Sequence, residues 1–396
     1  MKIRDFILSL VSWFILLVTV SCSDELGGER APISSESNLH VLVPTVLSSR
    51  GTRADDASGL PTYNATVDEC QINDLTLYAF PTGNEGKLLV ETLPAPLATM
   101  MVEPHVANYQ LNIEPGTYHI YVVANMNKVL SGQTIKTEND LKNIVLYYRP
   151  TSTPGMPVCT NIPMIYEPKD DAGNLAETVI NAAGDKYTEV AANLKFTCVK
   201  VKLNLIFDPS NKEVATNFGG KTFSINSISA DKLSPFTHLY WGGKFETPTW
   251  PNNEDKEAYK KGIPSTPYEA SGAAVYYTDW TDNRSQPATN NTVDIEGTGT
   301  AEKVSPAGKW LFQQTYYLPE RYISSESDRS YLTINGKVGN SAVNNYRINL
   351  GHKKNETSTT EVPVFPRGTF YEITGAIKTL GNMELDCKVS VKPWEM

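Results

Sequence analysis

The side chains that most often carry catalysis are sparse in this sequence and follow no known catalytic spacing. The five histidines lie far apart along the chain, at His40, His105, His119, His238 and His352. No nucleophile elbow, zinc-protease helix motif or phosphate-binding glycine loop occurs. Asp279 and Asp282 lack the spacing of a calcium loop, so we interpret them as solvated carboxylates. We therefore expect no enzymatic activity and no bound metal or cofactor.

Cys22 lies where a covalent modification is expected. It follows a positively charged start and an apolar run over residues 6–20, which is short for a membrane span and typical of a secretory signal. A cysteine at this point resembles the lipid-modified cysteine of bacterial lipoproteins, although Thr19 and Val20 depart from the usual motif. We expect a signal peptide over residues 1–21 and a lipid on Cys22 that anchors the chain in the outer membrane. An ordinary signal peptide with an unmodified cysteine is the alternative.

The other four cysteines follow no metal-site pattern. They are Cys70, Cys159, Cys198 and Cys387, with no CxxC pair and no histidine at ligand spacing. Export permits disulfides, but scattered cysteines in a large domain also occur as buried thiols, so their pairing stays open.

The segment LSSRGTRAD, residues 47–55, offers a second kind of chemistry, which is proteolysis. Its two arginines lie among small polar residues, where a trypsin-like protease can bind the chain. We expect the cut between Arg53 and Ala54, because a hydrophilic run follows, with Arg50 and Gly51 as the second choice. The cut would detach the strand-like segment that precedes it. The apolar residues of that segment are Leu39, Val41, Val43 and Val46. Loss of a paired strand leaves a groove that a strand of another chain can fill, and head-to-tail filling builds a filament.

Such an exchange also needs a donor strand. Near the C-terminus, apolar residues alternate with polar ones, at Leu385, Cys387, Val389 and Val391. Two interpretations stay open: this segment is the donor, or it is the last strand of its own domain.

The elements around these sites are mostly short strands. Alternating apolar residues predict strands over residues 72–80, 194–208, 310–322, 330–338 and 367–377. In the strand at 194–208, one face is expected to be buried and the face with Lys200, Lys202 and Asn204 to be wet. The EPGT sequence at 114–117 predicts a hairpin, and the spacing over 137–148 predicts a helix that Thr137 and Asp140 cap. Together they predict a mainly β fold of two tandem β-sandwich domains with one or few short helices.

The loop-rich middle of the chain, from about residue 209 to 310, contains many aromatic residues. Exposed tryptophans on loops can stack on sugar rings, which makes three of them candidate glycan contacts, although aromatic residues of a core are commoner. These are Trp241, Trp250 and Trp280. The alternative function is therefore a monomeric surface lipoprotein that binds glycan through aromatic loops. The net charge of −9 argues against nucleic acid as a partner.

Several motifs in this order resemble the fimbrillins, the lipoprotein-derived type V pilins of Gram-negative anaerobes. Besides Cys22 and the strand before TRA, they are PGTYHIYVVAN, LKFTCVKVKLNL, YLPER and FPRGTFYEITGAI. The resemblance implies transthyretin-like sandwich domains, lipidation at Cys22, and a cut at Arg53–Ala54 by an arginine-specific protease that removes the strand. It also implies a structural subunit of a surface fimbria. Such a subunit assembles with its own or other fimbrial subunits by donor-strand exchange, and a host glycan or protein would be its ligand.

The expected organisation is a signal peptide (1–21), a lipidated propeptide (22–53) and two sandwiches (54–190 and 191–396). Stalk subunits of this family usually carry a C-terminal extension as donor, whereas this chain stops at Met396, just after a strand. The positions of stalk, tip and accessory subunit therefore stay open.

Overall fold

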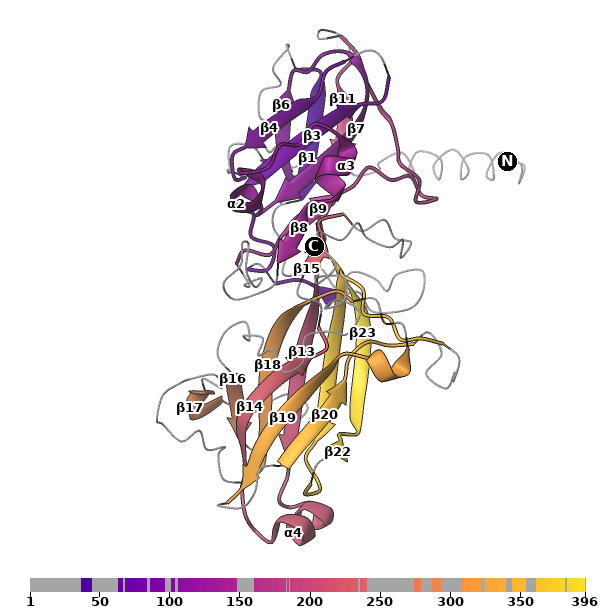
Figure 1. Cartoon of the computed structure of the whole chain (residues 1–396). Helices are drawn as coiled ribbons and strands as arrows, with labels where there is room; N and C mark the ends of the chain where they lie inside the picture. Colours follow the sequence, from indigo (N-terminus) through magenta and orange to yellow (C-terminus); the bar gives the residue numbers. More distant parts are fainter. Residues whose placement is uncertain are drawn as a thin grey trace, which may run out of the picture.

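The structure is a computed structural model of the whole chain, and two β-sandwiches are stacked along its long axis (Figure 1). It describes residues 37–44, 63–66, 68–83, 86–96, 101–103, 106–147, 160–182, 184, 186–233, 236–240, 274–278, 287–293, 308–321, 323, 325–339, 344–353, 361–381 and 383–395. Within these ranges, no helix is long and apolar enough to cross a membrane. The predicted class, mainly β with tandem sandwiches and few short helices, is confirmed.

The N-terminal sandwich consists of two sheets. The first has the order β11-β1-β6-β5. Its strands are β1 (Leu39–Pro44), β5 (Met101–Glu103), β6 (Val106–Leu111) and β11 (Thr188–Ala191). The second has the order β12-β9-β7-β3-β4, with β10 paired to β7. Its strands are β3 (Leu75–Pro81), β4 (Leu89–Leu93), β7 (Gly116–Ala124), β9 (Met164–Tyr166), β10 (Thr178–Ile180) and β12 (Lys195–Phe196).

The C-terminal sandwich also consists of two sheets. The larger has the order β17-β16-β18-β13-β21-β23-β2. Its strands are β2 (Tyr63–Asn64), β13 (Cys198–Phe207), β16 (Ala274–Thr278), β17 (Pro287–Val293), β18 (Trp310–Pro319), β21 (Thr369–Ala376) and β23 (Cys387–Glu395). The smaller has the order β14-β19-β20-β22. Its strands are β14 (Phe223–Asp231), β19 (Tyr331–Val338), β20 (Asn344–Asn349) and β22 (Met383–Glu384).

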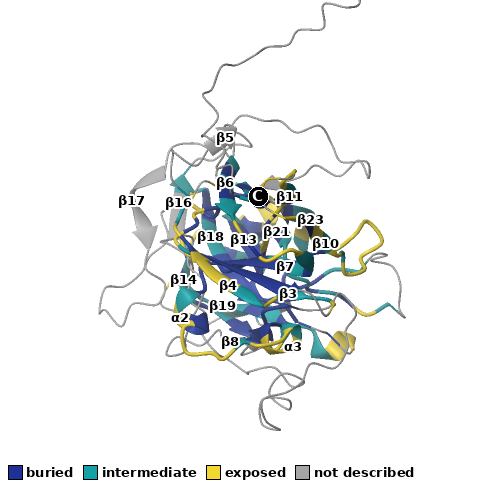
Figure 2. Ribbon diagram, turned by 90° about the horizontal axis from the view of Figure 1, so that it is seen from above, coloured by how far each residue is buried: buried dark blue, intermediate teal, exposed yellow. Residues whose placement is uncertain are grey.

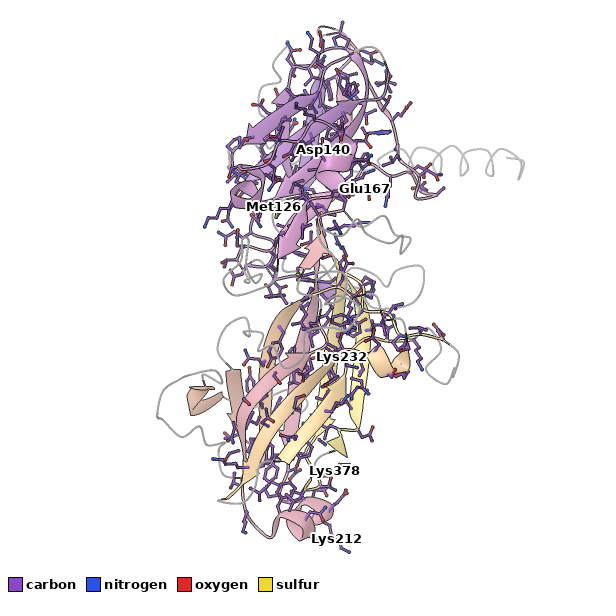
Figure 3. The ribbon with its side chains drawn as sticks, in the orientation of Figure 1. Met126, Asp140, Glu167, Lys212, Lys232 and Lys378 are labelled. Atoms are coloured by element: carbon purple, nitrogen blue, oxygen red, sulfur yellow. The ribbon has the colours of Figure 1, made fainter. Side chains whose placement is uncertain are left out.

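An aromatic cluster fills the core of the C-terminal sandwich. Trp310 is fully buried, and its ring lies 5.6 Å from that of Phe207 and 6.5 Å from that of Phe223. Gly336 on β19 leaves room for Phe223, because a Cβ at this glycine would lie 2.1 Å from the Phe223 ring. Helix α4 (Lys212–Phe218) closes this end of the sandwich, where Lys212 and Lys378 lie (Figure 3).

The helices are short, and one prediction about them was half right. Thr137 and Asp140 form the predicted capping box at the start of α3 (Glu138–Lys142), and Asp140 is labelled on this helix in Figure 3. However, α3 ends at Lys142, and β8 (Val145–Tyr147) follows where the helix was expected to continue. Residues 145–147 of this stretch pair with residues 236–238 as a strand instead of continuing the helix. Within the described ranges, the remaining helices are α2 (Asn127–Leu130) and the 3-10 helix η2 (Glu326–Asp328).

The predicted hairpin around EPGT was wrong. β6 pairs with β1 and β5, whereas β7 pairs with β3, β9 and β10, so the chain crosses from one sheet to the other at residues 112–115. Two alternating runs joined by a turn are compatible with both arrangements, and the packing of the two sheets decides between them.

The prediction of a wet face on β13 was wrong as well. Lys200 and Asn204 are 4% and 5% exposed, and Lys202 is half-buried. This face is covered at Lys200, whose ammonium lies 5.2 Å from the ring centre of Phe370 and 5.7 Å from that of Trp394. The Lys200 ammonium is compensated there by the carboxylate of Glu69, 2.5 Å away.

Strand pairing also joins the two sandwiches. β8 pairs antiparallel with β15 (Phe236–His238), and both lie at the junction in Figure 1. The buried Tyr240 hydroxyl follows β15 and lies 3.3 Å from the carbonyl oxygen of Val122 and 3.1 Å from that of Tyr166. The segment after β14 is therefore docked on the N-terminal sandwich.

Candidate functional site

β1 occupies an inner position in the first sheet of the N-terminal sandwich. It pairs parallel with β11 and antiparallel with β6 (Figure 1). Val41, for example, lies opposite Val190 of β11 and Tyr109 of β6. Because β11 and β6 are joined in this sheet only through β1, loss of β1 would leave a gap one strand wide between two unpaired backbones.

The apolar side chains of β1 belong to the core. Leu39, Val41 and Val43 are each 0% exposed, and these are three of the four residues predicted for the removable strand. The fourth, Val46, lies outside the described residues. The strand ends at Pro44, whose ring leaves no N–H for a further pairing.

Asn38 fixes the start of β1 with buried hydrogen bonds. Its side-chain amide donates to the carbonyl oxygens of Ile113 and Asn181, at 2.8 Å each. Its Oδ1 accepts from the Ile113 N–H at 2.9 Å. Since Asn38 is only 2% exposed, these partners satisfy a side chain that would be costly to bury alone.

His40 holds the other face of β1 against β11. Its ring stacks on that of Tyr187, 3.8 Å away with an interplanar angle of 11°. Ser37 Oγ lies 3.0 Å from its Nε2, and the Asn108 amide lies 3.4 Å from its Nδ1. Burial lowers the pKa of His40 below 6.5, and the nearby carboxylate of Glu189 opposes this shift. The neutral imidazole is therefore the form that fits this position.

The residues after the predicted cut are anchored in the C-terminal sandwich. β2 pairs parallel with the end of β23. Shortly afterwards, Glu69 accepts a hydrogen bond from the Tyr317 hydroxyl at 2.6 Å and pairs with the Lys200 ammonium. Glu69 is 2% exposed, and the Lys200 ammonium also lies 5.7 Å from the ring centre of Trp394. The chain on either side of the predicted cut is thus held by different sandwiches.

Several predicted site residues lie outside the described residues and stay predictions. They are Cys22, Arg50, Gly51, Arg53, Ala54, Trp241, Trp250 and Trp280.

The predicted terminal strand pairs within its own sandwich. β23 pairs antiparallel with β21 from Cys387 to Pro393. Leu385 is buried just before it, Cys387 and Val391 are half-buried, and Val389 is 41% exposed. Trp394 stacks on Phe196 with 3.9 Å between ring centres. To act as a donor, this segment would first have to leave these partners.

The described residues bring together no obvious chemical centre. Among them, no group of three or more His, Cys, Asp and Glu residues could hold a metal ion. His119 contacts Glu138, and His352 Nδ1 lies 2.7 Å from the Tyr371 hydroxyl. Of the described cysteines, Cys70 and Cys198 are buried and Cys387 is half-buried.

Sequence reasoning did not find the polar residues that anchor the two segments. Asn38 and His40 are polar residues in an otherwise apolar segment. Polar residues at such positions are the signal that both faces of the strand are covered. The alternating pattern predicts a solvated Lys200, because nothing in the nearby sequence shows that the distant Glu69 carboxylate compensates the charge of its ammonium.

Comparison with protein families gives one match, which covers residues 44–193. The matching family is described as "Major fimbrial subunit protein (FimA)". The match begins at the last residue of β1 and ends just after β11, so it spans most of the N-terminal sandwich. A comparison with curated proteins gave no match.

A comparison with solved structures gives matches at low sequence identity. One is a candidate cell adhesion protein from Parabacteroides distasonis, with 12% identity, a TM-score of 0.49, and coverage of 91% of this chain and 98% of that chain. Another, from Bacteroides eggerthii, has 14% identity, a TM-score of 0.49, and coverage of 92% and 98%. The tip fimbrial protein Mfa3 from Porphyromonas gingivalis, with a C-terminal truncation, has 14% identity, a TM-score of 0.42, and coverage of 90% and 99%.

At these identities and scores, the assignment depends on the family match rather than on the solved structures. The matched residues form most of the sandwich that contains β1, and the match agrees with the resemblance of the sequence motifs. Residues 44–193 of this chain are therefore similar to the family of the major fimbrial subunit FimA.

Proposed function

We propose that the chain is exported as a lipoprotein and becomes an assembling fimbrial subunit when a protease removes β1. The signal peptide covers residues 1–21, and the lipid is attached to Cys22. An arginine-specific protease cuts between Arg53 and Ala54, or between Arg50 and Gly51, which separates the lipidated propeptide from the sandwiches at 54–190 and 191–396. The observation that carries the proposal is the inner position of β1, between β11 and β6, directly before the segment with both arginines.

Cleavage by itself does not expel β1. The three fully buried side chains contribute about 5–9 kcal/mol, at roughly 1.5–3 kcal/mol each, and strand pairing and Asn38 add to this. A cut therefore converts β1 from a covalent part of the fold into a bound peptide. An incoming strand then displaces it by replacing its contacts one after another.

The shape of the slot defines the donor. A donor strand needs three apolar side chains at alternating positions, to replace Leu39, Val41 and Val43. It must also pair with β6 on one side and β11 on the other. Since the slot of one subunit is filled by another surface of the next, the contact does not close on itself and builds a filament. The position of this subunit in the filament, as stalk, tip or accessory subunit, stays open.

The part of the chain that remains keeps its own anchor. β2 and the Glu69–Lys200 pair hold the residues after the cut on the C-terminal sandwich. The residues of β2 are thus held on the other sandwich and not in the slot, which supports entry of a strand from another subunit.

The experiment is a strand-exchange assay on the full chain with limited arginine-specific proteolysis. A fluorescent peptide with the sequence of residues 37–46 is added to cut and uncut protein, and its binding is followed by anisotropy. We expect binding and release of native β1 only after the cut. An Arg50→Ala, Arg53→Ala double variant should stay uncut and bind no peptide. A cut protein that retains β1 in excess peptide, over days and at raised temperature, would contradict the proposal.

A further inference from the structure

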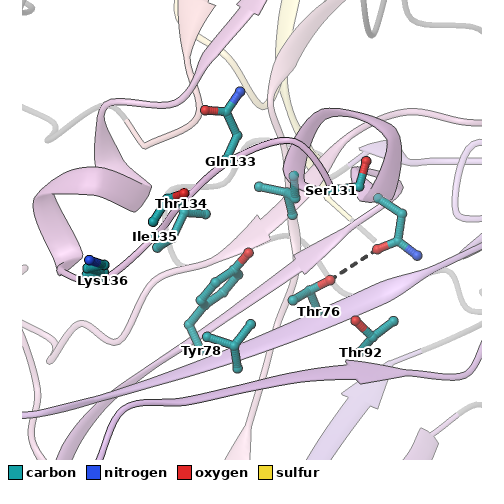
Figure 4. Close-up of a pocket in the computed structure, with 11 residues that line it drawn as sticks. Thr76, Tyr78, Thr92, Ser131, Gln133, Thr134, Ile135 and Lys136 are labelled. Atoms are coloured by element: carbon teal, nitrogen blue, oxygen red, sulfur yellow. Dashed lines mark hydrogen bonds between the residues drawn. The ribbon is translucent and has the colours of Figure 1, made fainter.

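The N-terminal sandwich carries a pocket on the second sheet, which does not contain β1. Its floor consists of two neighbouring cross-strand pairs, Thr76 opposite Thr92 and Tyr78 opposite Val90, on β3 and β4. Helix α2 and residues 131–136 form the opposite wall (Figure 4). The pocket encloses about 670 Å³, within the range of roughly 300–1,000 Å³ that is usual for small-molecule sites.

Tyr78 presents its hydroxyl to this pocket. The residue is 2% exposed, and its ring stacks on Phe80 with 6.0 Å between ring centres. Its hydroxyl points toward the segment 131–136 in Figure 4 and makes no hydrogen bond within the part of the chain that the structure describes. Burial raises the pKa of Tyr78 to about 12, so the hydroxyl is a neutral donor at physiological pH. A ligand oxygen in the pocket would accept a hydrogen bond from this donor.

The other lining groups share the same chemistry. Hydroxyl and amide side chains predominate, and Thr76 donates to Asn127 Oδ1 at 3.2 Å, as the dashed line in Figure 4 marks. Leu130, Ile135 and Val90 add an aliphatic surface. Of the described residues that line the pocket, none is acidic, and only Lys136, at the exposed rim, is charged.

This composition favours one class of ligand. A cation would need carboxylates or a set of carbonyl ligands, and a phosphate or sulfate would need more than one exposed lysine. A purely apolar ligand would leave the hydroxyl and amide groups without partners. A sugar presents hydroxyl groups around its ring and aliphatic C–H groups on its faces, which matches both parts of this lining.

We propose that this pocket binds a short neutral oligosaccharide, so that the subunit carries a glycan site of its own. The site is open at the side of the edge strand β4, whose residues Val90–Thr92 are exposed (Figure 2). Because no lining residue comes from β1, β6 or β11, sugar binding does not require removal of β1 and does not depend on the proposed strand exchange.

The test begins with the uncut full chain on an array of neutral and acidic oligosaccharides. Neutral di- to tetrasaccharides that bind are then titrated by calorimetry against three variants and two controls. Thr92→Trp places an indole in the pocket from an exposed position and should abolish binding. Tyr78→Phe removes only the hydroxyl and should weaken binding roughly two- to tenfold, as expected for one neutral hydrogen bond. Lys136→Ala should change the affinity for a neutral sugar little.

The controls separate pocket effects from folding. Glu91→Trp changes the exposed neighbour of Thr92, which does not line the pocket, and Tyr187→Phe removes the hydroxyl of an exposed tyrosine elsewhere in the sandwich. Both should bind like the parent chain. Three results would overturn the proposal: no neutral sugar that binds at millimolar concentration, binding that survives Thr92→Trp, or binding confined to acidic sugars and lost in Lys136→Ala. Capture of extended peptides along β4 without any sugar would overturn it too.

Discussion

Asn38 and Ile113 exchange two buried hydrogen bonds, the Ile113 N–H donating to Asn38 Oδ1 at 2.9 Å and the Asn38 amide donating to the Ile113 carbonyl at 2.8 Å. The pair ties the residue before β1 to the crossing between β6 and β7. The two hydrogen bonds join the Asn38 side chain to one backbone residue in the same way as a pair of hydrogen bonds between two strands. They therefore fix the register in which Leu39, Val41 and Val43 enter the core. After a cut at the arginines, this contact, the strand pairing and the three buried side chains together retain β1.

Replacing Asn38 by alanine should therefore loosen β1. The change leaves the N–H and carbonyl groups of Ile113 buried without a partner, which costs about 1–3 kcal/mol. We expect the free energy of urea unfolding to fall by this amount in the uncut chain and β1 to exchange faster in the cut chain. Asn193→Ala, at an exposed position after β11, should change neither quantity. Equal effects of the two substitutions would contradict the role of Asn38.

Acid should weaken the hold on β1 through His40. Its folded-state pKa lies below 6.5, so its contribution to stability is full above pH 6.5 and is lost as the pH falls through 6.5 toward the folded-state pKa. After correction for the slower intrinsic exchange in acid, the protection factors of the β1 amides should fall between pH 7 and pH 5. His40→Gln should remove this dependence.

His238→Gln is the control, because the pKa of His238 is also lowered by burial but the residue lies at the junction of the sandwiches. The acid dependence at β1 should persist in this variant. If His40→Gln retained the full dependence, another group would have to be responsible.

The buried Glu69–Lys200 pair should be essential for stability only as a pair. Lys200→Met leaves the Glu69 carboxylate buried without its cation and should cost about 3–5 kcal/mol. The double variant with Glu69→Gln should recover part of this loss, because neither charge remains. Denaturant unfolding measures both. Lys87→Met breaks a pair whose lysine is 82% exposed and should change stability by less than about 0.5 kcal/mol. A double variant that is no more stable than Lys200→Met would contradict this account.

The buried thiols should be silent in the folded protein. Burial raises the pKa of Cys70 from 9.0 to about 12 and raises that of Cys198 as well, whereas Cys387 is half-buried. Iodoacetamide at pH 8 should label Cys387 first. Since the two buried thiols ionise only in the unfolded state, their contribution to stability should decline above pH 9, by about 1.4 kcal/mol per pH unit for each thiol. Mass spectrometry of labelled peptides and unfolding at pH 8–10 check both statements.

Much of the fold could be predicted because it depends on local patterns. The strand at β1, the long strand β13 and the capping box of α3 follow from alternation and from Thr137 and Asp140 alone. What failed depends on distant partners. The crossing after β6 is decided by which sheet each run joins, β8 is a strand because β15 lies beside it, and Lys200 is buried because Glu69 compensates it.

The candidate site divides in the same way. The apolar row of β1 is visible in the sequence as Leu39, Val41 and Val43, and the arginines that follow suggested its removal. The anchors Asn38 and His40 could not be found, because their partners Ile113 and Tyr187 lie far along the chain.

The most direct test of the central claim is the N-terminal sequence and intact mass of this subunit in fimbriae detached from the native cell surface. We predict a chain that begins at Ala54, or at Gly51 if the second arginine pair is used, and that lacks β1. A fimbrial subunit that begins at an acylated Cys22 and retains Leu39–Pro44 would contradict the claim that removal of this strand opens the site of assembly.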